Sequence, residues 1–370
     1  MSTPSDAATA TPSPAEKPSE SEGGVLVVGA GIAGLACALA LREAGVPVRV
    51  VDRGRRPGGR MSGRTLHGRA VDLGASYFTV PDGSGFAQVV DSWQHRGLAH
   101  PWTDTFSVLP APEPTAPATA ETKTGPMRYA AAAGLRSLVA DLADAARAAG
   151  AAVDLSRDIS RVHPDGTVEP APEPAGAGGG GPYDVVVLAM PEPQAARLLE
   201  PGSPVAAGLD VEAWEPALAI ALDYAERVWP ADLHGAFVDG SPIVTFLADD
   251  GDRRGDGAPV LVAHTTAAFA AQHLDTPDAA IPAVTAEVVA LLGLAPDILP
   301  TWAHAHRWTF ARATSTHPEP YLLEGRIAVC GDAWGGRSSV STACASGDAL
   351  GRALAARPRD APGGDSSASA

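Results

Sequence analysis

Three glycines near the start of the chain have the spacing of a phosphate-binding turn. Gly29, Gly31 and Gly34 stand in the run VVGAGIAGL. A glycine at the middle position lets the backbone approach a diphosphate closely, and the unpaired N–H groups at the start of a following helix attract its charge. We therefore expect this turn, with Ala30 and Ala33, to bind the diphosphate of a dinucleotide.

The elements expected around the turn support this interpretation. Residues 25–28 are typical of a strand, residues 35–45 of a helix, and residues 46–52 of a second strand that ends in Asp52. Asp52 follows Gly34 by 18 residues, where a carboxylate can accept hydrogen bonds from an adenosine ribose.

A membrane-spanning helix is the alternative, because residues 24–41 carry no charge. As one helix they would reach roughly 27 Å, close to the thickness of a bilayer core. Each glycine inside such a helix would cost about 1 kcal/mol relative to alanine, and the preceding tail is acidic instead of basic. Nucleotide binding is therefore favoured, and we expect no membrane span.

Length and composition exclude other classes. The 370 residues predict two domains, and a formal net charge of −16 argues against nucleic acid as a partner. Cys37, Cys330 and Cys344 lack the spacing of disulfides or zinc fingers, so we expect them to pack in the core. His304 and His306 alternate on an expected strand, but no third ligand accompanies them, and we expect no metal site. Nothing in the sequence favours a particular oligomeric state.

The two ends of the chain are rich in Pro, Ser, Thr and Ala. Residues 1–22 and 357–370 offer no apolar core, so we expect both to be disordered tails. The first tail lacks the basic start and apolar block of a signal peptide, which favours a cytoplasmic location.

The residues after Asp52 distinguish between dinucleotides. They read RGRRPGGRMSGR, from Arg53 to Arg64. A bare backbone at Gly59 permits close approach, and Arg60 offers a cationic fork for phosphate. An acidic ribose partner followed by GGR is typical of FAD proteins related to amine oxidases and glutathione reductase, whereas an exposed basic loop is the alternative.

A third motif lies in residues 326–354, RIAVCGDAWGGRSSVSTACASGDALGRAL. It predicts a strand ending at Gly331 and Asp332, a glycine turn and a helix from about Ser341. In FAD proteins with this pattern the aspartate reaches the ribityl hydroxyls, and the helix N-terminus faces the flavin pyrimidine ring. A turn aspartate without a ligand is the alternative.

Taken in order, the motifs resemble the renalase-like branch of the flavin amine oxidase superfamily. The resemblance covers about residues 24–354 and also rests on DLGASYFT, GPMRYAAAAGLRSL, DVVVLAMPEPQAARLL and HAHRWTFARA. Renalase-like chains carry Arg-Val-Glu before the last helix, whereas this chain reads SSVSTA at residues 338–343, which weakens any transfer of substrate specificity.

The resemblance implies noncovalent FAD, because no cysteine lies in an attachment motif of the family. The expected cofactor contacts are Gly29, Ala30, Gly31, Ala33, Gly34, Asp52, Arg53, Gly59, Arg60, Met61, Ala75, Ser76, Ile159, Gly331, Asp332 and Val340. Ile159, in a strand after the helix at residues 135–149, is expected to lie against adenine.

The expected fold is α/β, with a discontinuous Rossmann-type FAD-binding domain and a second α+β substrate domain, as in amine oxidases and renalases. The first comprises residues 23–80, 127–203 and 317–356, and the second residues 81–126 and 204–316. Strands are expected at ALAIALDY, PIVTFLA and PVLVAHT, and one amphipathic helix at residues 278–293. Residues 110–124 are expected to form a surface loop, and residues 169–182 a flexible one.

The sequence also offers side chains for the substrate pocket. Flavin chemistry needs a donor carbon held beside the flavin in a water-poor pocket. Tyr77, Phe78 and Trp308 are candidates for its walls, and His306 for a hydrogen bond to substrate, with ordinary core packing as the alternative for each. Tyr77, His306 and Trp308 are thus the candidate catalytic residues.

Three functions remain open. The resemblance implies an oxidase of misformed dihydronicotinamide isomers of NAD(P), with O2 as acceptor and hydrogen peroxide as product. The alternative is a flavin amine oxidase or desaturase acting on another small metabolite. Many amine oxidases place a lysine beside the flavin, and this chain has only Lys17 in the tail and Lys123 in an expected loop. A flavin-binding module without activity is the third possibility.

Overall fold

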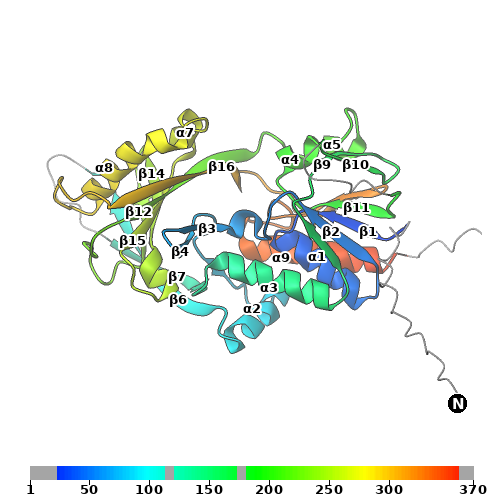
Figure 1. Cartoon of the computed structure of the whole chain (residues 1–370), viewed down its shortest axis with the longest axis horizontal. Coiled ribbons are helices and arrows are strands. Elements are labelled where there is room, and N and C mark those ends of the chain that lie inside the picture. Colours follow the sequence, from blue (N-terminus) through cyan, green and yellow to red (C-terminus); the bar gives the residue numbers. More distant parts are fainter. Residues whose placement is uncertain (1–22, 113–120, 173–180, 358–370) are drawn as a thin grey trace, which may run out of the picture.

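The computed structural model describes residues 23–112, 121–172 and 181–357. Figure 1 shows a parallel sheet with long helices at one end of the molecule and a larger, mainly antiparallel sheet at the other. The predicted tails lie outside the described residues, apart from residue 357, and so does the middle of each predicted loop.

The first sheet has six strands, in the order β17, β18, β11, β1, β2, β8. Their bounds are Leu322–Glu324, Ile327–Val329, Val185–Leu188, Val25–Val28, Val48–Asp52 and Ala152–Leu155. Only β17 runs antiparallel to its neighbour. Every residue of β1 and β11 is buried, because layers cover both faces of this sheet.

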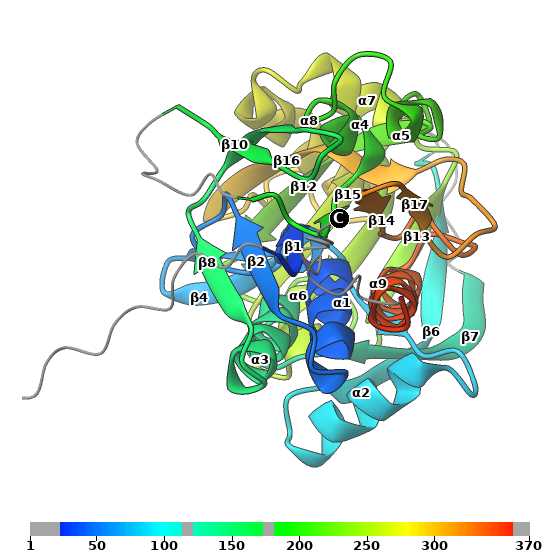
Figure 2. The same ribbon diagram turned by 90° about the vertical axis from the view of Figure 1, so that its right-hand side faces the viewer.

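Three helices cover one face of this sheet: α1 (Ile32–Glu43), α3 (Leu135–Ala148) and α9 (Val340–Ala355), which lie side by side in Figure 2. Helices α1 and α9 approach closely because α9 carries glycines at the contact. A Cβ at Gly347 would lie 1.9 Å from the Ala33 carbonyl oxygen. This packing brings the N-terminus of α9 beside the glycine turn.

The opposite face is covered by a hairpin of β9 (Ile159–Val162) and β10 (Val168–Pro170), with the short helices α4 (Glu192–Ala196) and α5 (Pro204–Ala207). Ile159 is buried at the start of β9, in the strand position that the sequence predicted.

The second sheet has eight strands, in the order β16, β12, β15, β14, β13, β6, β7, β5. Their bounds are Trp302–Ala313, Trp214–Asp223, Val260–Thr265, Val244–Asp249, Gly235–Asp239, His100–Pro110, Glu121–Ala130 and Phe78–Thr79. The three strands predicted here from ALAIALDY, PIVTFLA and PVLVAHT are β12, β14 and β15.

The side chains of β12 alternate between the two faces of this sheet and show which elements cover each face. Leu218, Ile220 and Leu222 pack toward α8 (Ile281–Leu291), with α7 (Ala267–Gln272) on the same side. Ala219 and Ala221 face the other way, against the hairpin of β3 (Gly63–Leu66) and β4 (Arg69–Asp72). The second face therefore looks toward the first sheet.

Three local predictions were wrong in part. Residues 169 and 170 were expected in a flexible loop, but they end β10, where Glu169 pairs with Arg161 of β9. Residues 121–124 were expected in a surface loop, but they begin β7, because Thr122, Lys123 and Thr124 pair with Ser107, Phe106 and Thr105 of β6. The helix expected at residues 278–293 is divided into a 3-10 turn, η2 (Pro277–Ala280), and α8, because Pro282 enters at the start of the α-helix.

The division into two domains stays a prediction. Helix α2 (Gly85–His95), from the segment predicted for the substrate domain, places Phe86, Val90 and Trp93 in the same core as α1 and α3. No helix in the described parts of the chain is both long and apolar enough to cross a bilayer, and the uncharged stretch at residues 24–41 forms β1 and most of α1.

Candidate active site

A cavity of about 2040 Å³ is lined by residues of both sheets. Pockets for a drug-sized ligand measure roughly 300–1,000 Å³, so this cavity can hold a large cofactor together with a second molecule. Fourteen of the sixteen predicted cofactor contacts line it. The other two, Ala30 and Gly34, are buried directly behind its wall.

Two of the fingerprint glycines are required by the protein itself. Gly29 has φ +119°, which L side chains rarely adopt. A Cβ at Gly34 would lie 2.0 Å from the Gly29 carbonyl oxygen. These two residues shape the turn from β1 into α1.

Gly31 has no such explanation within the protein. Its φ of −83° suits any residue, and a Cβ there would meet only the Gly59 Cα, at 3.8 Å. A Cβ at Gly59 would lie 3.2 Å from the Gly31 Cα, so two bare backbones meet at the wall of the cavity, just before α1 and at the start of η1 (Gly59–Met61). A side chain at either position would project from backbone that a diphosphate is expected to approach.

Asp52, at the end of β2, is already held by the turn. Its Oδ2 accepts from the Ala30 N–H at 2.7 Å, and its Oδ1 accepts from the Gly54 N–H at 2.6 Å. Each carboxylate oxygen keeps a second lone pair. Asp52 can therefore hold the turn and accept from a ribose hydroxyl at once.

Arg60 and Asp332, which the sequence predicts as separate cofactor contacts, bind each other. Both Nη atoms of Arg60 donate to the Asp332 carboxylate, and the Ser338 hydroxyl donates to it as well. Burial raises the pKa of Asp332, but the Arg60 charge and these hydrogen bonds outweigh it and leave the pKa below its usual value. The pair joins the GGR turn to the residues that precede α9.

The N-terminus of α9 also opens on the cavity. Ser339 caps this helix by accepting from the Thr342 N–H at 3.1 Å, and Val340 at the first helical position lines the cavity. The positive end of the helix dipole therefore faces the cavity, and its contact with the flavin stays a prediction.

The segment from Asp72 to Ser76, after β4, is fixed from three sides. The Trp308 Nε1 donates to the Leu73 carbonyl at 2.6 Å, the Ala75 N–H donates to the Arg60 carbonyl at 2.9 Å, and Arg253 Nη1 donates to the Ser76 carbonyl at 2.8 Å. Ala75 and Ser76 line the cavity in this rigid setting.

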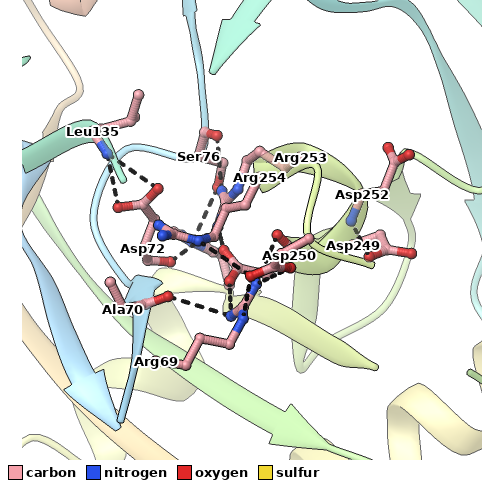
Figure 3. Close-up of polar contacts among 12 residues, drawn as sticks. Arg69, Ala70, Asp72, Ser76, Leu135, Asp249, Asp250, Asp252, Arg253 and Arg254 are labelled. Carbon is pink, nitrogen blue, oxygen red and sulfur yellow. Dashed lines mark hydrogen bonds and ion pairs between the residues drawn. The ribbon is translucent and has the colours of Figure 1, made fainter. Parts of the chain in front are cut away.

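A buried ionic cluster supports that segment (Figure 3). Arg253, on α6 (Asp250–Arg254), has no exposed surface and pairs with Asp250, which also binds Arg69. Asp72 accepts from the Leu135 N–H at 3.0 Å and so caps α3. Burial raises the pKa of Asp72 to about 6 against the opposing charge of Arg253.

One wall of the cavity is aromatic and lies on the second sheet. We call Tyr77, Arg128, Phe237, Phe246 and His264 the aromatic wall; all five line the cavity. Phe246 lies 6.1 Å from Tyr77, 5.5 Å from Phe237 and 6.3 Å from His264, between ring centroids. His264 also lies 3.3 Å from the Ser76 hydroxyl. The wall therefore adjoins the segment predicted to contact the flavin.

Both histidines at the cavity are neutral near pH 7. Burial, with the charge of Arg253, lowers the pKa of His264 to about 4. Burial, with the charges of Arg64 and nearby groups, lowers the pKa of His306 to about 4. Neutral imidazoles can donate or accept a hydrogen bond, but they add no positive charge.

The three predicted catalytic candidates do not all lie together. His306 and Trp308 are neighbours on β16, with ring centroids 4.7 Å apart, whereas Tyr77 lies on the aromatic wall. All three line the cavity, and Phe78 does too. Their roles in catalysis stay predictions.

Charge around the cavity is strongly positive although the chain is acidic. Thirteen arginine and lysine side chains line it, against four carboxylates. The carboxylates are Asp52, Asp158, Glu215 and Asp332, none of them on the aromatic wall. Lys123 also lines the cavity, exposed on β7 five residues before Arg128, and Lys17 lies outside the described residues.

His264 and Arg128 line the cavity but were not among the predicted site residues. The run PVLVAHT carried a signal for His264, because alternation places it on the same face as Val260 and Val262. No pattern marked Arg128, which stands in GPMRYAAAAGLRSL before the helix predicted at residues 135–149. Within the described residues no group of three or more His, Cys, Asp or Glu could hold a metal ion, and the three cysteines are buried and do not line the cavity.

Comparison with known proteins identifies the family. Residues 114–349, more than half of the chain, match the family described as flavin containing amine oxidoreductase. The chain belongs to this family. Residues 27–93 match the NAD(P)-binding Rossmann-like domain, the part that holds the glycine turn. As a flavin amine oxidoreductase, the protein is an FAD-dependent oxidoreductase that binds its cofactor noncovalently.

Solved structures confirm the fold. Putrescine oxidase bound to putrescine aligns with a TM-score of 0.68 at 16% identity, over 90% of this chain and 99% of that one. Cyclohexylamine oxidase from Brevibacterium oxydans aligns with a TM-score of 0.65 at 15% identity, over 90% and 98%. At such identities the likeness concerns the fold alone.

A curated relative matches over a short stretch. The neurosporene-forming phytoene desaturase of Rhodobacter capsulatus is 50% identical over 66 residues, which is 18% of this chain and 13% of the desaturase. The match leaves most of both proteins unaligned.

Proposed function

We propose that this flavin amine oxidoreductase takes a hydride from a small donor that is neutral or anionic, with O2 as the acceptor. The carrying observation is the charge of the cavity. Thirteen cationic side chains line it, and the aromatic wall holds Arg128 but no carboxylate. A cationic amine would meet like charge there, without a partner.

The residues that hold FAD follow from the fit of the cavity. Gly31 and Gly59 leave room for the diphosphate, Asp52 faces the ribose, and the Arg60–Asp332 pair stands between the GGR turn and α9. Bound FAD supplies the hydride acceptor. The Leu73 and Ser76 carbonyls, held by Trp308 and Arg253, fix the backbone beside it.

The first candidate donor is a dihydronicotinamide isomer of NAD(P). A dihydropyridine releases a hydride without a protein base, and the aromatic wall offers only a weak one, because burial lowers the pKa of His264 to about 4. The reaction balances as dihydronicotinamide plus O2 and one proton, giving NAD(P)+ and hydrogen peroxide. The planar ring suits the faces of Tyr77 and Phe246.

The second candidate is an amine oxidase or desaturase of another small metabolite. The printed names of the relatives and neighbours, a phytoene desaturase and oxidases of putrescine and cyclohexylamine, support this candidate more directly than the first. The fold and the cofactor frame suit both candidates. The two candidate functions differ in the charge of the donor molecule that would bind at the aromatic wall.

Anaerobic mixing separates the candidates. The purified yellow protein is mixed with 2- and 6-dihydronicotinamide isomers, ordinary NADH, a panel of amines and a solubilised carotenoid precursor, and bleaching of the flavin band is followed. Bleaching by the isomers alone supports the first candidate. Bleaching only by amines or the carotenoid precursor would overturn it in favour of the second.

A further inference from the structure

Arg128, on β7, is a buried cation without a polar partner among the residues that the structure describes. Its exposed fraction is 6%, and its side chain makes no hydrogen bond or ion pair with any described residue. The guanidinium carbon lies 3.9 Å from the ring centroid of Phe106 and 5.6 Å from that of Tyr77. Aromatic faces stabilise a cation, but they leave its N–H groups without acceptors.

Other buried arginines have hydrogen-bond acceptors that Arg128 does not have among the described residues. Arg253 is fully buried, and it binds Asp250 and the Ser76 carbonyl. Arg254 is 8% exposed and donates to the Ala132 carbonyl at 2.6 Å. Burial of a guanidinium without an acceptor is unfavourable, so its N–H groups call for an acceptor from water, an ion or a ligand.

The surroundings of Arg128 leave room for that ligand. Arg128 lines the cavity beside Tyr77, and no carboxylate stands on the aromatic wall. Gly125 faces the guanidinium, since a Cβ there would lie 3.4 Å from Nη2. Lys123, five residues earlier on β7, adds a second positive charge to the lining of the cavity.

We propose that Arg128 binds an anionic oxygen of the donor, a carboxylate or a phosphate, while the planar part of the donor lies against Tyr77 and Phe246. This deepens the proposed function and rests on it. A planar guanidinium between aromatic faces presents its N–H groups at one edge, in the fork that matches both oxyanions. Arg128 is thus the specificity-determining residue for an anionic donor.

The test measures binding to the holoenzyme and needs no turnover. Changes in the flavin absorbance are followed during titration with nicotinate and with nicotinamide, which share a ring and differ in carboxylate against carboxamide. Wild type is expected to bind nicotinate about 10- to 100-fold more tightly. Inorganic phosphate is then titrated against bound nicotinate. If phosphate displaces nicotinate, the site binds phosphate as well as carboxylate. If phosphate does not displace nicotinate, the site binds carboxylate.

Variants localise the preference. Arg128→Met is expected to bind both probes equally weakly, and Arg128→Lys to keep part of the preference, because lysine keeps the charge but loses the fork. Arg352→Gln, at an exposed arginine on α9 outside the cavity, is the matched control and should bind as wild type does. If Arg128→Met fails to hold FAD, the preference for nicotinate over nicotinamide is compared between wild type and Arg128→Lys, and this comparison still tests the role of Arg128.

Equal affinity of wild type for the two probes, or an unchanged preference in Arg128→Met or Arg128→Lys, would overturn the role of Arg128. This failure is distinct from that of the proposed function. An anion preference without oxidation of any dihydronicotinamide isomer contradicts the first candidate alone. Oxidation of the isomers without an anion preference contradicts Arg128 alone.

Discussion

The Arg253 guanidinium donates to the Ser76 carbonyl across 2.8 Å, and this bond joins α6 to a segment that lines the cavity. Arg253 can hold this position because Asp250 neutralises its charge where no water reaches either side chain. The segment also binds Trp308 through the Leu73 carbonyl. The backbone predicted to lie beside the flavin is thus positioned by elements that lie far away in the sequence.

Arg253→Met should destabilise the protein by about 3–5 kcal/mol, because it breaks a fully buried ion pair and leaves Arg69 as the one remaining ion-pair partner of Asp250 among the described residues. Chemical unfolding of the holoenzyme measures this loss, and flavin reduction should also slow as Ser76 is released. Arg96→Met removes an exposed arginine paired with Asp141, and it should cost less than about 1 kcal/mol. Equal losses in the two variants would show that the buried pair is not special.

Two glycine variants should separate cofactor binding from folding. Gly31→Ala places its Cβ in space bounded by the Gly59 Cα at 3.8 Å, so the apoprotein should keep its stability and lose affinity for FAD. Gly34→Ala drives its Cβ to 2.0 Å from the Gly29 carbonyl oxygen, so it should lower stability even without cofactor. Chemical unfolding of both apoproteins measures their stability, and titration with FAD measures their affinity for the cofactor. A Gly31→Val protein that is as yellow as wild type would contradict the close approach.

Asp52→Ala should yield protein with little bound FAD. The variant loses the expected ribose contact and also the acceptors for the Ala30 and Gly54 N–H groups. Asp52→Asn keeps one acceptor oxygen and should retain part of the binding. The FAD content measured after gel filtration should decrease in the order wild type, Asp52→Asn, Asp52→Ala. The reverse order of the two variants would rule out an acceptor role.

Acid should destabilise the fold through His264. Its pKa is about 4 in the folded protein and about 6.5 when unfolded, so the unfolded chain binds more protons between these values. Above pH ~6.5, where His264 is neutral in both states, its effect on the free energy of unfolding is constant. As the pH falls from ~6.5 to ~4, the free energy of unfolding decreases by about 3 kcal/mol through this residue. Asp72 titrates in the same window with the opposite sign, since its pKa is raised to about 6. The measurement is therefore the difference in slope between wild type and His264→Asn, and identical slopes would refute the assignment.

The cofactor half of the site was largely predictable because its chemistry is local in sequence. The strand, turn and helix from Val25 to Glu43 follow from a short apolar run, three glycines and a helical period, and the structure has them at those positions. The same holds for β18 and α9 around Asp332. Backbone that must approach a diphosphate leaves a fixed spacing of small residues.

The donor half could not be predicted in the same way. Arg128 and His264 meet the cavity only because β7 and β15 lie in one eight-stranded sheet, whose strand order no local pattern contains. The pairing of Arg60 with Asp332 joins residues 272 positions apart. Lys123 was assigned to a loop because a Pro/Ala/Thr run precedes it, yet pairing with β6 makes it part of a strand. Tertiary pairing overrides local propensity at such edges.

The effect of ionic strength on anaerobic flavin reduction tests the central claim most directly. The second-order rate constant is measured for an anionic dihydronicotinamide dinucleotide isomer over a range of salt concentrations. A cavity whose lining is dominated by arginine attracts an anionic donor, and salt screens this attraction. The account predicts a rate constant that falls steadily as salt increases. A rate constant that rises with salt, or reduction by cationic amines and not by the dinucleotide at any salt concentration, would contradict it.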